Sequence, residues 1–340
     1  MKVIELIGMS LLASSLLLGA TSVADKAKNA GLKAIPSDKA ELMKLIDPNG
    51  TITAERVELG KKLYFEPRLS KSGIISCNTC HNLGLGGVDG VPAAVGHNWT
   101  ANPHHLNSPT VYNAVFFAAQ FWDGRSPDLE NQAQGPMQAP PEMAAPPALV
   151  EERVNSIPAY IDEFKKAYGK DVKVDFATIT KTIGIFERTL VTPSRFDDYL
   201  NGKEDALTDA EKAGLATFID KGCATCHNGI ALGGTMQPFP VAGKFKYASV
   251  GDFKGDKSAM VKTPTLRNIT ETAPYFHNGT EWNLAEAVKI MGETQLGTKI
   301  SDEDAVKIVT FFGALKGKKP EMVYPQLSES TLKTPKPDFK

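Results

Sequence analysis

The chain has 340 residues, of which 42% are hydrophobic and 23% are charged, a balance that is ordinary for a globular protein. Its 38 basic and 39 acidic side chains nearly cancel, which argues against nucleic acid as a partner. This length is enough for two domains, each with a core of its own.

The first 24 residues differ in composition from the rest. Lys2 precedes an apolar stretch over residues 11–20, and Ser22 and Ala24 are the small residues expected before a cleavage point. This pattern predicts a secretory signal peptide, residues 1–24, and a mature chain that begins near Asp25. The apolar stretch is short for a membrane anchor, and no later segment is apolar enough to cross a bilayer. We therefore expect a periplasmic protein with no membrane span.

Residues 25–192 form the first of two predicted domains. Asp38, with Glu41 three residues later, predicts a capped helix over residues 42–46, and a second helix is expected over residues 54–65. A closing helix is indicated by apolar residues spaced three and four apart, which share one face. These residues are Phe176, Ile179, Ile183, Phe186 and Leu190.

The second predicted domain, residues 193–317, follows the same plan. Thr208 and Glu211 form a capping box that opens a helix ending near Gly222, and Ser301 is the expected cap of a closing helix. Strand signals are few and short, so the fold is predicted to be mainly α. The proline-containing residues 318–340 are expected to form an extended arm, either across the surface or toward a partner subunit.

All four cysteines fall in two Cys-x-x-Cys-His motifs, residues 77–81 and 223–227, each after a predicted helix. This spacing is typical of c-type haem attachment, in which the thiols bind the haem and the histidine binds the iron. Structural zinc would need a further ligand near each motif, and disulfides are the other alternative. The predicted haem-binding residues are Cys77, Cys80 and His81 in the first motif and Cys223, Cys226 and His227 in the second.

A helix, a haem motif, a loop region and a closing helix therefore occur twice. We predict two cytochrome c-type domains, each with one covalently bound haem c. Export agrees with this prediction, because bacteria attach haem to such motifs outside the cytoplasm.

The second axial ligand of each iron decides what the haem can do. For the second haem, Met291 shares the inward face of a predicted helix with Ala287 and Val288, and Met236 is its competitor. Packing alone is the alternative role of Met291. A thioether ligand would raise the reduction potential and leave the iron fully coordinated, which suits electron transfer.

Four histidines remain as ligands for the first haem. His97 follows a glycine cluster over residues 84–90, and such a loop could bring a histidine to the iron in one state and remove it in another. A surface role is the alternative for His97. His104 and His105 follow a proline and are expected at the surface, and His277 remains open.

The sequence resembles the bacterial di-haem cytochrome c peroxidases, a family related to the di-haem enzyme that matures tryptophan tryptophylquinone. The resemblance extends from about Leu59 to Gly317 and depends on five separate motifs. They span residues 76–84, 107–110, 120–125, 274–279 and 291–297.

The resemblance implies that the two haems have different functions. The N-terminal haem would reduce peroxide, with His97 matching its displaceable distal ligand, while the C-terminal haem would receive electrons, with Met291 matching its axial methionine. Trp122 matches a tryptophan between the haems, although filling space is its alternative role. Gln132 and Glu142 match residues of the peroxide pocket.

The resemblance also implies ligands and partners. A calcium ion would bind the side chain of Asn107 and the carbonyls of Thr272 and Pro274. Hydrogen peroxide would be the substrate, a small cytochrome c or a copper protein the electron donor, and the assembly a homodimer.

The chemistry of residues 139–146 supports the assignment of Glu142. This loop is apolar and Glu142 is its one charge, so burial would raise the pKa of the carboxyl and suit it to moving protons near neutral pH. The amide of Gln132 could hold peroxide or water because it both donates and accepts hydrogen bonds. Exposed surface positions are the alternative for both residues.

Three other functions compete with a peroxidase. They are a radical-forming enzyme of the related family, a di-haem electron-transfer cytochrome, and a dithiol oxidoreductase that uses the cysteine pairs. The presence of Met291 and His97 argues against the radical-forming enzyme. The resemblance implies that this enzyme has no axial methionine on its second haem and does not use the distal histidine as a ligand.

Overall fold

The computed structural model describes residues 22–239 and 245–340, so most of the expected signal peptide lies outside the described residues. The described chain is mainly helical, as predicted, with one short antiparallel pair of strands, β1 (Met236–Pro238) and β2 (Met260–Lys262). The helices are α1 (Val23–Asn29), α2 (Lys39–Ile46), α3 (Ala54–Tyr64), α4 (Cys77–Cys80), α5 (Leu129–Gln138), α6 (Pro147–Asn155), α7 (Pro158–Tyr168), α8 (Phe176–Glu187), α9 (Arg195–Leu200), α10 (Asp209–Asp220), α11 (Leu284–Met291) and α12 (Asp302–Gly313).

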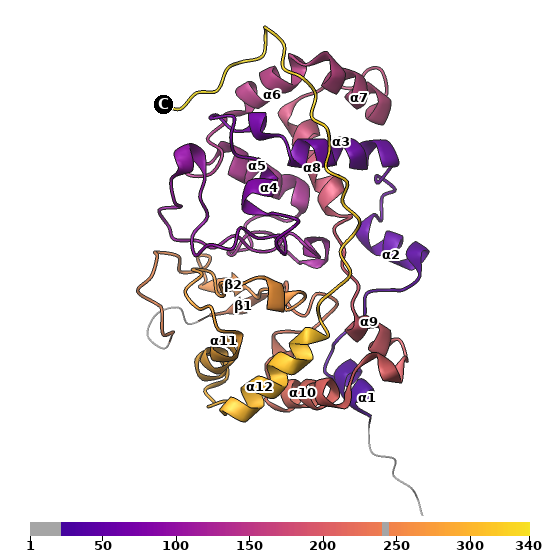
Figure 1. Ribbon diagram of the computed structural model, residues 1–340, viewed down its shortest axis with the longest axis vertical. Helices are drawn as coiled ribbons and strands as arrows, with labels where there is room; N and C mark the ends of the chain where they lie inside the picture. The colour runs from indigo at the N-terminus through magenta and orange to yellow at the C-terminus, as the bar shows by residue number, and fades with distance from the viewer. Residues whose placement is uncertain (1–21, 240–244) are drawn as a thin grey trace, which may run out of the picture.

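Helices α3 to α8 form the upper part of the molecule, and α1 and α9 to α12 form the lower part (Figure 1). In the upper part, α8 packs against α3 and α5. Asp175 caps α8 by accepting the amide of Thr178 at 3.0 Å, which confirms a helix at the predicted stripe. All five stripe residues, through Leu190, are buried in one hydrophobic core.

The lower part has its own core, built around the packing of α10 on α12. Thr208 and Glu211 form the predicted capping box of α10, and Ser301 caps α12. Gly214 allows the two helices to approach closely, because a Cβ atom there would lie 2.1 Å from the carbonyl oxygen of Lys307. Helix α1 also packs on α10, with Ala24 and Ala27 buried.

A hydrogen-bonded cluster joins the two parts at Thr192, the position of the predicted boundary. The Thr192 hydroxyl accepts the side-chain amides of Asn113 at 2.7 Å and Asn268 at 2.9 Å. Both asparagines have left-handed backbones, with φ of 63° and 61°, a conformation that asparagine tolerates better than most residues. Thr192 therefore connects one loop from each part of the molecule.

Residues 318–340 run as an extended chain from the lower part across the upper part (Figure 1). The buried guanidinium of Arg153 donates to the carbonyl of Lys336 at 2.9 Å, and the amide of Asp338 donates to the carbonyl of Lys71 at 3.0 Å. The arm thus lies along its own chain rather than away from it. Within the described ranges, no helix has the length and apolarity needed to cross a membrane.

A buried ion pair stabilises the lower part. Arg267, which is fully buried, donates to both carboxylate oxygens of Asp197 at 2.7 and 2.9 Å. Replacing Arg267 with Met would leave the carboxylate buried and unpaired, so the free energy of unfolding should fall by about 3–5 kcal/mol. Urea denaturation followed by circular dichroism would measure this loss. An unchanged unfolding midpoint would contradict the assigned role.

The matched control is the exposed pair of Lys203 and Asp198, whose side chains are 66% and 43% accessible. Because solvent screens such a pair, replacing Lys203 with Met should change the free energy of unfolding by less than about 1 kcal/mol.

Candidate active site

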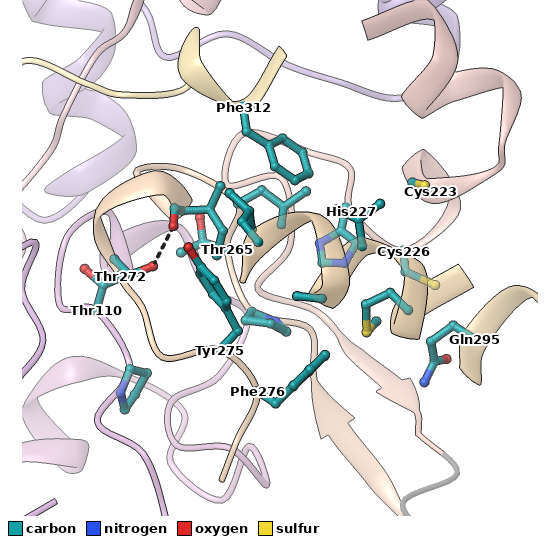
Figure 2. A pocket seen from close by; sticks show the side chains of 18 of the residues that line it. Thr110, Cys223, Cys226, His227, Thr265, Thr272, Tyr275, Phe276, Gln295 and Phe312 are labelled. Atoms are coloured by element: carbon teal, nitrogen blue, oxygen red, sulfur yellow. Dashed lines mark hydrogen bonds between the residues drawn. The ribbon is translucent and has the colours of Figure 1, made fainter. Parts of the chain in front are cut away.

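The second cysteine motif borders a largely apolar cavity in the lower part of the molecule. Helix α10 ends before Gly222, whose φ of 86° turns the chain into the motif. Figure 2 shows the thiols of Cys223 and Cys226 near the imidazole of His227. The cavity encloses about 1290 Å³, including its open mouth, and Phe312 and Tyr275 are among the aromatic residues that line it.

Each motif histidine is oriented by a backbone carbonyl. His81 Nδ1 lies 2.9 Å from the oxygen of Pro109, and His227 Nδ1 lies 3.3 Å from that of Leu232. A proton on Nδ1 would leave Nε2 free to bind a metal, an arrangement that is common for metal-binding histidines. Burial lowers the pKa of His227 to about 4, so its imidazole is neutral at neutral pH.

Met291 and Met236, the two candidate thioethers, lie in different places. Met291 ends α11 and lines the cavity beside His227. It is followed by a π-helix, η7 (Gly292–Leu296), an irregularity that is frequent at functional sites. Met236 is instead packed close to Gly124 and does not border this cavity. The geometry thus favours Met291.

The first motif, on α4, lines a second cavity of about 1990 Å³, including its open mouth, whose lining comes mainly from the upper part. Ser76 caps the short helix together with Thr79. Gln132, on α5, and Glu142, in the loop after α5, line the same cavity as Cys77, Cys80 and His81. The structure therefore brings the expected peroxide-pocket residues to the first motif.

Glu142 is half-buried at this cavity. Burial raises the pKa of its carboxyl, and the positive charge of Arg125 opposes this effect. Its backbone carbonyl accepts the amide of His97 at 2.6 Å. Gly96 allows this approach, because a Cβ atom there would lie 2.6 Å from the same oxygen.

His97 lies in a short helix, η2 (His97–Trp99), and is not among the described residues that line the cavity of the first motif. Its Nδ1 atom is buried and has no hydrogen-bond partner within the described residues. The next two residues, Asn98 and Trp99, have φ angles of 58° and 56°, which are uncommon without glycine. The backbone of His97 is therefore held against Glu142, which itself lines the cavity of His81.

The other histidines have separate environments. His104 is exposed, as expected, and pairs with Asp252 at 2.9 Å. His105 is half-buried. His277 is buried among aromatic rings, including that of Trp122, and burial lowers its pKa to about 4.

The two cavities border one shared wall, which includes Trp122. The indole of Trp122 donates to the carbonyl of Asn107 at 3.0 Å, and this bond fixes the ring between the cavities. The shared wall consists of Asn107, Ser108, Pro109, Thr110, Phe117, Trp122 and Lys262.

The three expected calcium ligands, Asn107, Thr272 and Pro274, all line the cavity of the second motif. The Asn107 side chain donates its amide to Val91. Within the described residues, no protein donor bonds to its Oδ1 atom or to the carbonyls of Thr272 and Pro274. These neutral oxygens suit a hard cation.

Two buried charged residues escaped the sequence analysis. Glu187, next to the apolar stripe of α8, lines the cavity of the first motif, and burial raises its pKa to about 8. Lys262 lies in the shared wall. Nothing in the sequence marks Lys262 as buried, since a lysine in a three-residue strand is ordinarily exposed. Glu187 does have a signal, because it is a charged residue within a helix whose other residues are mostly apolar.

The cysteines are suited to haem attachment rather than to dithiol chemistry. None of the four forms a disulfide. Burial raises the pKa of Cys80 to about 12 and that of Cys223 to about 11, whereas a reactive dithiol needs a lowered thiol pKa. Two thiols and one oriented imidazole beside each large cavity fit a covalent haem.

Comparison with known proteins agrees with this chemistry. Residues 54–205 match the family model described as di-haem cytochrome c peroxidase. The cytochrome c551 peroxidase of Pseudomonas aeruginosa is 49% identical and the comparison covers 90% of each chain. The cytochrome c551 peroxidase of Nitrosomonas europaea is 44% identical, over 83% of this chain and 86% of that protein.

The fold has solved counterparts as well. A MauG-like protein associated with microbial copper homeostasis superposes with a TM-score of 0.68 at 24% identity, over 78% of this chain and 91% of that one. This likeness concerns the fold, and the two peroxidase relatives above show that the chain belongs to the di-haem cytochrome c peroxidase family.

Proposed function

We propose that this protein is a periplasmic cytochrome c peroxidase that reduces hydrogen peroxide with electrons from a small cytochrome c or a copper protein. Peroxidase activity is supported by the relatives named cytochrome c551 peroxidase. The observation that carries the proposal is the difference between the cavities. No described residue with a carboxyl side chain lines the cavity of the second motif, whose lining includes the Met291 thioether, whereas Glu142 and Gln132 line the cavity of the first motif.

In this proposal residues 25–192 and residues 193–317 each hold one haem c, while α1, at the start of the first range, packs on α10 in the lower part. When bound, the haems supply the electrons and the iron chemistry that cleaves peroxide. Cys77, Cys80 and His81 hold the first haem, and Cys223, Cys226 and His227 hold the second. The signal peptide over residues 1–24 directs export, and the protein functions as a homodimer.

Glu142 and Gln132 act on the substrate. The Glu142 carboxylate accepts a proton from one peroxide oxygen and returns it to the oxygen that leaves as water, a transfer suited to a carboxyl whose pKa is raised by burial. The Gln132 amide orients the peroxide by hydrogen bonding. Trp122, in the shared wall, assists the passage of electrons from the second cavity to the first.

His97 acts as a switch. With both haems bound, His97 would hold the first iron in the resting enzyme and block peroxide, and it would leave that iron once the second haem is reduced. In the described position of His97, the buried Nδ1 atom has no partner among the described residues, and leaving such an atom unpaired costs about 1–3 kcal/mol. A second position of the His97 side chain, in which the ring nitrogens have partners, would therefore compete with the described position. A two-state switch requires two such positions.

Met291 as the axial ligand of the second haem gives a direct prediction. Replacing Met291 with His should lower the potential of this haem by roughly 0.1–0.3 V, within the ~0.8 V range that axial ligands span. A spectroelectrochemical titration would measure the change. Replacing Met236 with His is the control and should leave the potential of this haem unchanged. If the Met236 variant changed the potential and the Met291 variant did not, Met236 would be the axial ligand.

Calcium bound by Asn107, Thr272 and Pro274 would link the two parts of the molecule, because Asn107 belongs to the upper part and the other two to the lower. Treatment with a calcium chelator should abolish most of the reductive activation, and added Ca²⁺ should restore it. Stopped-flow assays after reduction would follow the recovery. Full activation in the chelated enzyme would rule out this role.

The function is tested by adding hydrogen peroxide to half-reduced protein. The peroxidase should consume peroxide and show one high-spin iron by spin resonance, whereas an electron-transfer cytochrome would keep both irons low-spin and leave peroxide intact. A radical-forming enzyme would instead oxidise tryptophan in an added protein substrate without needing Met291.

A further inference from the structure

Within the described residues, Lys262 is a buried lysine with no ion-pair partner. Its side chain is 4% exposed, and it forms no ion pair or side-chain hydrogen bond within residues 22–239 and 245–340. The internal stretch outside this range, residues 240–244, contains no Asp or Glu that could supply a counter-charge. Lys262 borders the two cavities, and an ammonium without a counter-charge becomes strongly unfavourable when an apolar group fills them, so the position favours a bound anion.

The immediate contacts of Lys262 explain its place but not its charge. Its backbone amide donates to the carbonyl of Trp122 at 2.8 Å, which fixes β2 against the shared wall. Its ammonium lies 4.5 Å from the centre of the Phe117 ring, a cation–π contact that offsets only part of the cost of burial. Asp123 attracts this charge from farther away, but its carboxylate pairs with Arg125 at 2.7 Å.

The location of Lys262 indicates which anion could supply its counter-charge. Lys262 borders both cavities, and it is the one Lys or Arg among the described residues that line the cavity of the second motif. The first cavity also has Arg125, which is exposed and already paired. Each haem of the family carries two propionate carboxylates, and these must find cations or water when the haem is enclosed in a largely apolar cavity.

We propose that the Lys262 ammonium donates a charge-assisted hydrogen bond to a haem propionate at the wall shared by the two cavities. The proposal needs the two haems that family membership implies and does not depend on peroxidase activity. A bound carboxylate gives Lys262 its counter-charge, and the Lys262 ammonium gives the propionate a charged hydrogen-bond donor. Burial lowers the pKa of Lys262 to about 7, and a propionate would oppose this effect.

Lys262 is thus a positioning residue that also tunes a haem. Its positive charge favours the reduced form, because reduction removes one positive charge from the iron. Replacing Lys262 with Met should therefore lower the potential of the bonded haem by about 59 mV, a tenfold shift in the one-electron equilibrium. Replacing Lys262 with Arg keeps the charge. The one-electron equilibrium constant of the bonded haem should then change by less than about twofold.

The experiment is a spectroelectrochemical titration of both haems in the holoprotein. A lowered potential in the Lys262→Met protein supports the proposal, and the haem that responds identifies which propionate is bonded. The control is Lys257→Met, since Lys257 is exposed in the same segment and should leave both potentials unchanged. Unchanged potentials in Lys262→Met would overturn the proposal.

A second readout covers the case in which Lys262→Met does not fold or bind haem. The resonance Raman bands of propionate bending report hydrogen bonds to the carboxylate. The Lys262→Arg protein should shift one of these bands, because a guanidinium has a different donor geometry. Bands identical to those of the wild type would show that the side chain does not contact a propionate.

Discussion

Replacing Glu142 with Gln should lower the turnover of hydrogen peroxide by about 10²–10⁴-fold, the usual contribution of a general acid–base group. Gln keeps the size of the side chain but can no longer accept and return a proton. The haem spectrum and reduction potentials should stay those of the wild type, because the backbone contact between Glu142 and His97 is retained. Steady-state assays on pre-reduced enzyme would measure the loss.

The pH dependence separates a proton-transfer role from a structural one. Burial raises the pKa of Glu142, so the carboxyl stays protonated above the usual carboxyl range and becomes a base only as the pH rises further. In the wild type, kcat/KM should therefore increase with pH across that window, and this limb should vanish in Glu142→Gln. Glu152→Gln, at an exposed site on α6, is the matched control. A retained limb would exclude Glu142 as the base.

The second large effect is expected from His97. Replacing it with Gly should make the fully oxidised enzyme active without prior reduction, because the ligand that blocks the first haem is gone. If the resting state is about 1% open, removing the block raises the initial rate on the order of a hundredfold. Initial rates with and without pre-reduction, together with the spin state of the oxidised protein, would measure this change.

His105→Gly is the matched control for that experiment. His105 lies in the same segment and has a φ of 52°, so glycine fits its backbone and removes an imidazole without strain. This variant should still need reduction. If His97→Gly also needed reduction, another element of the protein would gate the first cavity.

Local signals in the sequence predicted much of the fold. Capping by Asp38, Thr208 and Ser301 and the stripe of α8 depend on residues three or four apart, and such contacts can be read directly from spacing. The inward position of Met291 followed from helical spacing in the same way. The positions of the two cavities relative to each other did not follow, because no local pattern encodes them.

The unpredicted features all depend on contacts between distant segments. Thr192 bonds to Asn113 and Asn268, which lie 79 and 76 positions away in the sequence. Burial of Lys262 requires the loop of Phe117 from the other part of the molecule. His97 followed a glycine cluster in the sequence, but its contact with the carbonyl of Glu142 appears only when the two loops meet.

The extended arm has a consequence for vectorial synthesis. The carbonyl of Lys336 that bonds to Arg153 is separated from it by 183 positions. At ribosomal rates of about 5–20 residues per second, that carbonyl is made roughly 10–40 s after the arginine. The upper part must therefore wait for nearly the whole polypeptide before the guanidinium gains this bond. A chain that ends before Lys336 would keep the Arg153 bonds to the carbonyls of Arg68, Ser70 and Lys71 and would lack only the bond to the arm.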